Sequence, residues 1–324
     1  MKPTGLVKIS ILLLFFLFIF VFYDSLFMEI YASESGLAKP NSTIPWWFWP
    51  LSLFIVTFLI GIVAVLGGVG GGVLFVPIVG GFFPFHLDFV RGAGLLVALA
   101  GALTAGPGLL AKNLANLRLA LPFALIASTC AIFGAMIGLA LPTNIVQTAL
   151  GICILFIVGI MIKAKKSEYP EVKKTDALSN ALKIHGVYYE VSTGHTIKWK
   201  IHRTPQGLII FIFIGIMAGM FGLGAGWANV PVLNLLLGVP LKVSVGTSKF
   251  LLSITDTSAA WIYINNGAVL PMLVVPSIIG IMLGSFVGVK ILFKTKPAII
   301  RNIVIVMLFL AGLRSILKGL GIWT

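Results

Sequence analysis

Two glycine-rich stretches hold the residues whose types and spacing favour one kind of chemistry, the binding of a small anion. They read Gly68-Val-Gly-Gly-Gly-Val-Leu-Phe-Val-Pro77 and Gly222-Leu-Gly-Ala-Gly-Trp-Ala-Asn-Val-Pro231. Each stretch interrupts a long apolar run, so a new helix must begin there with unpaired backbone N–H groups. These groups and the positive end of the helix dipole attract anions. Alternatively, the glycines only allow helices to pack closely in a membrane.

The two stretches belong to an internal repeat with a constant offset of 154 residues. Beyond the glycines, the same offset relates Gly92 to Gly246 and Pro122 to Pro276. A match of this length without gaps indicates a duplicated unit. Glycine-interrupted apolar segments at matching positions in two halves point to the binding site of a transporter. The candidate substrate-binding glycines are therefore Gly68, Gly70, Gly72, Gly222, Gly224 and Gly226.

The second half supplies polar candidates that the first half lacks. Asn229 stands where the first stretch has Phe75. It either contacts the substrate or satisfies backbone groups that the break leaves free. Thr247 and Ser248 begin the following helix and offer hydroxyl groups. Lys249 either attracts anions into an inner vestibule or extends its ammonium group to the water interface.

Asp256 is the acid that lies well inside an apolar span, where a carboxylate is costly and marks a functional candidate. We expect Asp256 to couple transport to an ion, either by taking up a proton or by binding a cation. The alternative is a protonated structural acid that bonds to neighbouring hydroxyl groups. Asp256 follows Lys249 by seven residues. The two share a helix face but lie about 10 Å apart along its axis, so direct pairing is not expected.

The chain offers no arrangement typical of an enzyme. It has four His and two Cys, and no nucleophile–His–acid set or metal-ligand spacing appears among them inside the apolar spans. Cys130 and Cys153 lie within apolar runs and are interpreted as buried apolar residues. No enzyme activity, cofactor or metal is expected, and the lack of a nucleotide-binding motif excludes ATP hydrolysis by this chain.

Composition predicts an all-α polytopic membrane protein. The 324 residues are 59% hydrophobic and 10% charged, whereas a soluble protein has about 25% charged residues. The net charge of +14 does not favour nucleic-acid binding, because the basic residues lie between or beside apolar spans. Four regions are predicted: an N-terminal signal anchor or signal peptide with an outer linker (1–45), a first transmembrane repeat (46–162), a basic cytoplasmic loop (163–204) and a second repeat (205–324).

Each repeat is predicted to contain a glycine-broken helical hairpin followed by three transmembrane helices. In the first repeat the predicted helices are 49–66, a short arm 72–83, then 91–111, 118–141 and 144–162. In the second they are 206–221, an arm 226–237, then 244–264, 271–293 and 299–318. The broken hairpin enters and leaves on one side, and an odd number of helices follows. The two repeats should therefore have inverted topology, although Arg91, Arg314 and Lys318 do not fit the positive-inside rule.

The loop 163–204 is basic, with nine Lys or Arg against four Asp or Glu. Within it, Val187–Val191 and Thr196–Ile201 alternate β-forming residues around Gly194, which predicts a small β-hairpin. Its basic face either meets anionic lipid headgroups or is a solvated connector.

The element Gly-x-Gly-x-Gly…Val-Pro at 68–77 and 222–231, followed by Gly246-Thr-Ser248, resembles the TauE/SafE sulfite exporter family. The resemblance covers about 48–318. It implies a transporter that moves sulfite, sulfonates or similar small anions, mostly outward and with ion coupling. In the first half, Gly92-Ala-Gly94 stands where the second has Gly-Thr-Ser.

We therefore expect a multi-pass secondary transporter in the cytoplasmic membrane that exports a small sulfur-containing anion bound between the glycine hairpins. Its partners are this anion and the lipid bilayer, and the sequence leaves open whether the chain forms a homo-oligomer. Two alternatives remain: a passive anion channel with the same site, and a non-transporting membrane scaffold that acts through loop 163–204.

Overall fold

The computed structural model describes residues 47–67, 70–110, 114–163, 170, 172, 174–190, 195–292 and 297–322. The predicted N-terminal segment 1–45 and the candidate glycine Gly68 lie outside these residues. The described chain is almost entirely helical, apart from one short hairpin. The predicted all-α class is therefore confirmed.

The first half contains a long helix, a short helix and three further long helices, in the predicted order. Helix α4 begins four residues before its predicted start. Asp88 lies in its first turn, where a negative charge interacts favourably with the positive end of the helix dipole and stabilises the helix. Helix α5 begins where the Asn116 side chain accepts a hydrogen bond from the backbone N–H of Leu119 at 2.9 Å. The helices are α2 (Phe48–Gly67), α3 (Gly71–Phe82), α4 (Leu87–Leu110), α5 (Leu117–Ala140) and α6 (Thr143–Lys163).

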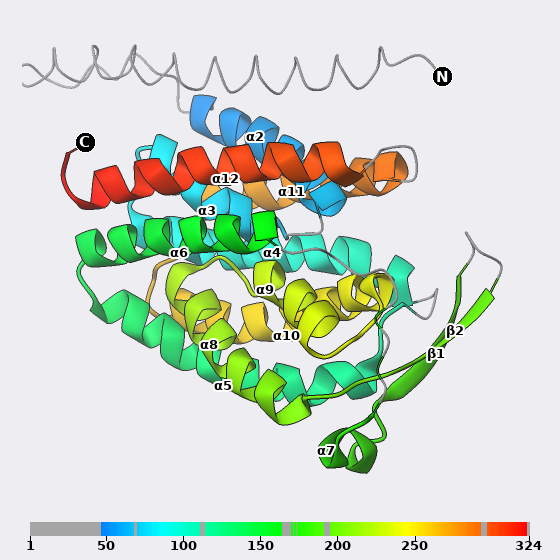
Figure 1. Ribbon diagram of the computed structural model, residues 1–324. Helices are drawn as coiled ribbons and strands as arrows, with labels where there is room; N and C mark the ends of the chain where they lie inside the picture. Colours follow the sequence, from blue (N-terminus) through cyan, green and yellow to red (C-terminus); the bar gives the residue numbers. More distant parts are fainter. Residues whose placement is uncertain are drawn as a thin grey trace, which may run out of the picture. The chain divides into compact units, whose positions relative to one another are not determined.

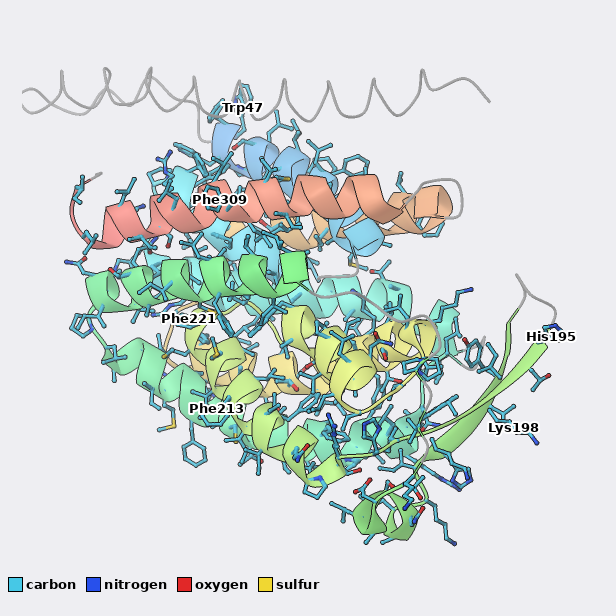
Figure 2. The ribbon with its side chains drawn as sticks, in the orientation of Figure 1. Trp47, His195, Lys198, Phe213, Phe221 and Phe309 are labelled. Atoms are coloured by element: carbon cyan, nitrogen blue, oxygen red, sulfur yellow. The ribbon has the colours of Figure 1, made fainter. Side chains whose placement is uncertain are left out.

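The connecting loop contains the predicted β-hairpin. A short helix, α7 (Ala177–Ala181), precedes strands β1 (His185–Glu190) and β2 (His195–Lys200). The strands pair antiparallel, with His185 opposite Lys200. Figure 2 shows His195 and Lys198 projecting from β2. The buried Trp199 packs over Gly186, so an aromatic ring covers one face of this small sheet.

The second half repeats the order of the first. Its elements are α8 (Thr204–Phe221), α9 (Gly226–Pro231), the π-helix η1 (Val232–Leu236), α10 (Leu241–Asn265), α11 (Pro271–Leu292) and α12 (Pro297–Gly319). Long helices thus occur at all of the predicted positions. The two halves are joined in sequence through the hairpin region and in space through extensive helix contacts.

The predicted arm 226–237 consists of two helical segments, the α-helix α9 and the π-helix η1. After Pro231 the backbone N–H of Leu237 donates to Val232 O at 3.1 Å, the wider spacing of a π-helix. Pro231 has no N–H and so permits the change. Proline alone is insufficient, because Pro77 leaves α3 α-helical. The Asn234 side chain, which donates to Val239 O at 2.8 Å, stabilises the altered turn.

Within the described residues, six helices are long and apolar enough to cross a membrane: α2, α4, α5, α6, α8 and α11. The shorter α3 is also apolar. Many large apolar side chains are exposed on the outer helix faces, including Phe213 and Phe309 (Figure 2). Helix α10 carries Lys249 and Asp256, yet it lies in the interior and packs against α4, α5, α8 and α9 (Figure 1).

Glycine contacts join the two halves, and each contact recurs with the halves exchanged. A Cβ at Gly134 of α5 would overlap the carbonyl oxygen of Ile216 in α8. A Cβ at Gly288 of α11 would lie 3.0 Å from the carbonyl oxygen of Ile62 in α2. Both the glycines and the isoleucines are 154 positions apart. The same helix contact is therefore made twice.

Equivalent helices of the two halves run in opposite directions where they touch. Gln147 near the start of α6 donates to Ser315 Oγ near the end of α12 at 3.1 Å. Arg91 near the start of α4 lies 5.7 Å from the ring centroid of Tyr263 near the end of α10. Each half therefore packs its third and fifth helices antiparallel to their counterparts. The opposite orientation of the halves in a membrane remains a prediction.

Candidate functional site

The two glycine breaks meet inside the helix core. A Cβ built on Gly70, directly before α3, would lie 3.7 Å from the Cα of Gly226, where α9 begins. A Cβ on Gly72 would lie 2.6 Å from the carbonyl oxygen of Leu223 and 3.0 Å from that of Gly94. The structure thus brings predicted glycines of both repeats together, and at Gly72 the backbone approach leaves no space for a side chain.

Two glycines of the second break have backbone conformations that side chains disfavour. Gly222 has φ +67° and ends α8, and Gly224 has φ +69°. Both values lie in the left-handed region, which glycine adopts without steric cost. Gly222 packs against the backbone of Arg91 on α4. The break is therefore held tightly against the first half.

Both short helices begin without a side-chain cap. Gly70 precedes α3 and Ala225 precedes α9, and neither position provides a side-chain hydrogen bond to the first turn. Since α9 continues directly into η1, each break is followed by a helical segment of more than two turns. The uncapped N–H groups at both starts fit the predicted attraction for an anion.

Asp256 lies directly against the second break. It is fully buried, and a Cβ on Gly224 would be 2.8 Å from its Oδ2 atom. The backbone N–H of Ala225 and the Lys249 ammonium group interact favourably with the carboxylate. Even so, neither carboxylate oxygen has a hydrogen-bond partner of normal geometry. An ionised carboxylate in this position is costly unless a proton or cation compensates it.

The hydroxyl groups near Asp256 do not bond to it. Thr257 Oγ1 donates to Ser253 O at 2.6 Å, and Ser258 Oγ donates to Ile254 O at 3.0 Å, both within α10. Thr255 Oγ1 is buried without a partner. In this structure, therefore, neighbouring hydroxyl groups do not hold Asp256, as they would if it were a hydrogen-bonded structural acid.

Lys249 is buried, with 8% of its surface exposed. The side chain therefore does not extend to the water interface in the way that an interfacial lysine does. Its ammonium group interacts electrostatically with Asp256, two turns further along α10. No ion pair joins these two described side chains, because the helix separates their backbone positions.

The remaining polar candidates differ in whether their polar atoms have hydrogen-bond partners. Asn229 is completely buried, and both its amide nitrogen and its amide oxygen lack a partner. The indole Nε1 of Trp227 on the same short helix is also unpaired. Thr247 Oγ1 accepts a hydrogen bond from the backbone N–H of Asn116 at 3.2 Å, so it positions the connection before α5. Ser248 is buried beside it on α10.

Arg91 supports the site from α4, a role that was not predicted from the sequence. This fully buried side chain donates to the carbonyl of Met220 at 2.8 Å and forms an ion pair with Asp88. Tyr263 OH donates to the neighbouring carbonyl of Gly219 at 2.9 Å. Together these groups anchor the last turn of α8, immediately before the second break. Figure 2 shows Phe221, the last residue of that helix, within the core.

The other two exceptions to the positive-inside rule anchor the end of α3. Arg314 Nε donates to the carbonyl of Gly81 at 2.6 Å, and Lys318 Nζ donates to that of Gly80 at 3.0 Å. A cation at the C-terminal end of a helix is favoured by the helix dipole. Each of the three basic residues that do not fit the positive-inside rule therefore donates a hydrogen bond to a backbone carbonyl within the protein.

Comparison with known proteins gives one family and one curated relative. The family model described as sulfite exporter TauE/SafE matches residues 53–315. A protein of Bacillus subtilis (strain 168), "Probable membrane transporter protein YunE", is 23% identical over 276 residues, which cover 83% of this chain and 97% of the relative. No solved structure matches the chain. The match covers both glycine breaks and every helix from α3 to α11.

Proposed function

The chain belongs to the TauE/SafE family of sulfite exporters, and on this premise we propose that it is a secondary transporter that exports a small sulfur-containing anion. Sulfite or a sulfonate, carried outward across the cytoplasmic membrane, is the substrate class we favour. The multi-pass membrane architecture agrees with six membrane-spanning helices and with a relative named as a membrane transporter.

The meeting of the two glycine breaks is the observation that carries this proposal. The contact between Gly70 and Gly226 places two uncapped helix starts side by side. Buried polar groups without partners lie on the adjoining elements, in particular Asn229 on α9 and Asp256 on α10. An anion bound between the breaks would receive N–H donors from both halves. Thr247, Ser248 and Lys249, in the first half of α10, are the further side chains that we propose for this site.

The proposed transport cycle uses inverted topology. The antiparallel contacts of α4 with α10 and of α6 with α12 support it, as do the glycine contacts that recur with the halves exchanged. In such transporters the site lies between the repeats, and one repeat moves against the other to expose it alternately to the two sides. Asp256 would couple this movement to a proton.

Uptake into liposomes that contain the purified protein tests the proposal. Sulfite, sulfate, taurine, sulfoacetate and methanesulfonate are supplied one at a time, with and without a pH gradient. We expect at least one of these anions to accumulate against its own concentration gradient when the pH gradient is present. Gly72→Ala should abolish that uptake, because the new Cβ would meet the Leu223 carbonyl.

Gly159→Ala is the matched control, since a Cβ at Gly159 in α6 meets no heavy atom within 4 Å. Flux that only follows the anion's own gradient would identify a passive channel. The lack of flux for every anion, from protein shown to be folded, would contradict transport. A scaffold that acts through loop 163–204 would then be the better interpretation.

A further inference from the structure

Two buried side chains that can carry opposite charges lie on α10, and one of them, Asp256, lies against the second glycine break. Lys249 and Asp256 lie on one face of α10, both buried, and interact electrostatically. Neither has an ion-pair partner of opposite charge on another described element. A site in which both groups are ionised would therefore hold one positive and one negative charge.

The elements packed against α10 add no further unpaired charge among the described residues. On α4, Arg91 and Asp88 form an ion pair with each other. On α5, Arg118 is exposed and Cys130 is partly buried. Helices α8, α9 and η1 contain no Asp, Glu, Lys, Arg or His. On α10 itself, the exposed Lys242 lies in the first turn and Tyr263 is hydrogen-bonded to α8.

A monovalent anion that entered this balanced site would leave it with one net negative charge. Burying an uncompensated charge among apolar helices is costly. Lys249 can supply the positive charge that balances the anion, but Asp256 would then remain as an uncompensated carboxylate. A proton on Asp256 removes that charge, and neither of its oxygens accepts a hydrogen bond of normal geometry in the described residues.

We propose that one proton crosses with each monovalent anion, so that the empty site and the loaded site both carry no net charge. In the empty state Asp256 is ionised and balances Lys249. In the loaded state the anion balances Lys249 and Asp256 holds the proton. This inference rests on the proposed function and adds the stoichiometry, the electroneutral cycle and the role of Lys249 as the substrate's counter-charge.

Methanesulfonate uptake by the purified protein in liposomes tests the charge balance. This anion carries a single charge at every pH used, whereas sulfite itself takes up protons near neutral pH. A potassium gradient with valinomycin sets the membrane potential, and internal pyranine reports proton entry. We expect uptake to follow the pH gradient with about one proton per anion, and to be the same at positive, zero and negative potential.

Variants at the two charged positions separate their roles. Asp256→Asn should lose proton entry, and its remaining uptake should become dependent on the membrane potential. Asp256→Glu should keep proton coupling because it keeps a carboxyl group. Lys249→Met should raise KM by more than about tenfold, since the anion loses its counter-charge. Thr257→Ala is the matched control, because the exposed Thr257 bonds only to its own helix.

The outcomes distinguish this inference from the proposed function. Uptake by the parent protein that changes with potential would overturn the electroneutral cycle and leave the transporter in place. Proton coupling that persists in a folded Asp256→Asn variant would overturn the assignment of the proton to Asp256. If the parent takes up no anion from the whole panel under any gradient, the proposed function fails and this inference fails with it.

Discussion

Asp256 and Gly224 depend on each other, because the carboxylate occupies the space where a side chain at position 224 would lie. Gly224→Ala would add a Cβ 2.8 Å from Oδ2 at a backbone with φ +69°. The left-handed conformation alone costs a non-glycine residue about 1–2 kcal/mol. We expect a lower melting temperature and the loss of flux, measured by thermal unfolding and by liposome uptake.

Gly159→Ala should instead raise the melting temperature of the protein. Position 159 lies within α6 with open space around it. Alanine is favoured over glycine in a helix by about 1 kcal/mol. A Gly224→Ala variant that melts and transports like the parent would contradict the backbone conformation described for the second break.

Arg91 gives the second prediction at this scale. Arg91→Met would leave the Asp88 carboxylate without its partner and the Met220 carbonyl without its donor. The Asp88 side chain is 27% exposed, so the cost should lie below about 3–5 kcal/mol, which is typical of breaking a fully buried ion pair on one side. We expect a strongly lowered melting temperature, followed by intrinsic tryptophan fluorescence. The exposed Arg118 supplies the control, because Arg118→Met should change stability by less than about 0.5 kcal/mol.

A double variant tests whether Arg91 and Asp88 act as a pair. Asp88→Asn alone leaves a buried guanidinium group without its negative partner. Asp88→Asn combined with Arg91→Met removes both charges, so the losses should be less than additive. Additive losses would show that the two side chains stabilise the protein independently.

At the scale of elements, close helix contacts at glycine hold the two halves together. Gly134 on α5 and Gly288 on α11 occupy equivalent places against α8 and α2. Small residues let membrane helices approach closely and gain dispersion energy. We expect Gly134→Ala to destabilise the protein by about 1–3 kcal/mol through overpacking. Gly288→Ala should cost less, because its Cβ would lie at a longer distance, 3.0 Å, from the Ile62 carbonyl.

Thermal unfolding of both glycine variants in one detergent measures this difference. A larger loss for Gly288→Ala than for Gly134→Ala would mean that the interface of α11 with α2 is the tighter one. The comparison also tests the repeat, since two equivalent contacts should respond to substitution in the same direction.

At the scale of the whole molecule, inverted topology predicts that equivalent turns lie on opposite sides of the membrane. Single cysteines at Arg118, next to the turn before α5, and at Asn266, in the turn before α11, can be introduced after Cys130 and Cys153 are replaced by alanine. A membrane-impermeant thiol reagent should label Asn266→Cys in intact cells. It should label Arg118→Cys only after the membrane is permeabilised.

Val187→Cys on the exposed face of the hairpin serves as a reference for the inner side. It should behave like Arg118→Cys, because loop 163–204 carries an excess of positive charge. Labelling of Arg118→Cys and Asn266→Cys from the same side would contradict inverted topology, and with it the alternating exposure of the site.

Local sequence patterns were sufficient to predict the order of the described elements, although not every boundary. Apolar periodicity, the two glycine breaks and the turn residues act over a few positions, so they predicted every long helix and the β-hairpin. The offset of 154 residues also predicted which glycines are equivalent. The π-helix after Pro231 was not predictable, because its proline is matched by Pro77 in a regular α-helix, and the bond from Asn234 to Val239 decides between them.

The tertiary structure alone decided which groups meet. Asp256 and Gly224 are 32 positions apart, and Arg91 and Met220 are 129 positions apart, so no local pattern links them. Thr247 was predicted to face substrate, yet its hydroxyl accepts the backbone N–H of Asn116 from the other half. Burial is likewise a property of the packed helices: it encloses the side chains of both Lys249 and Asp256, which no local sequence pattern shows.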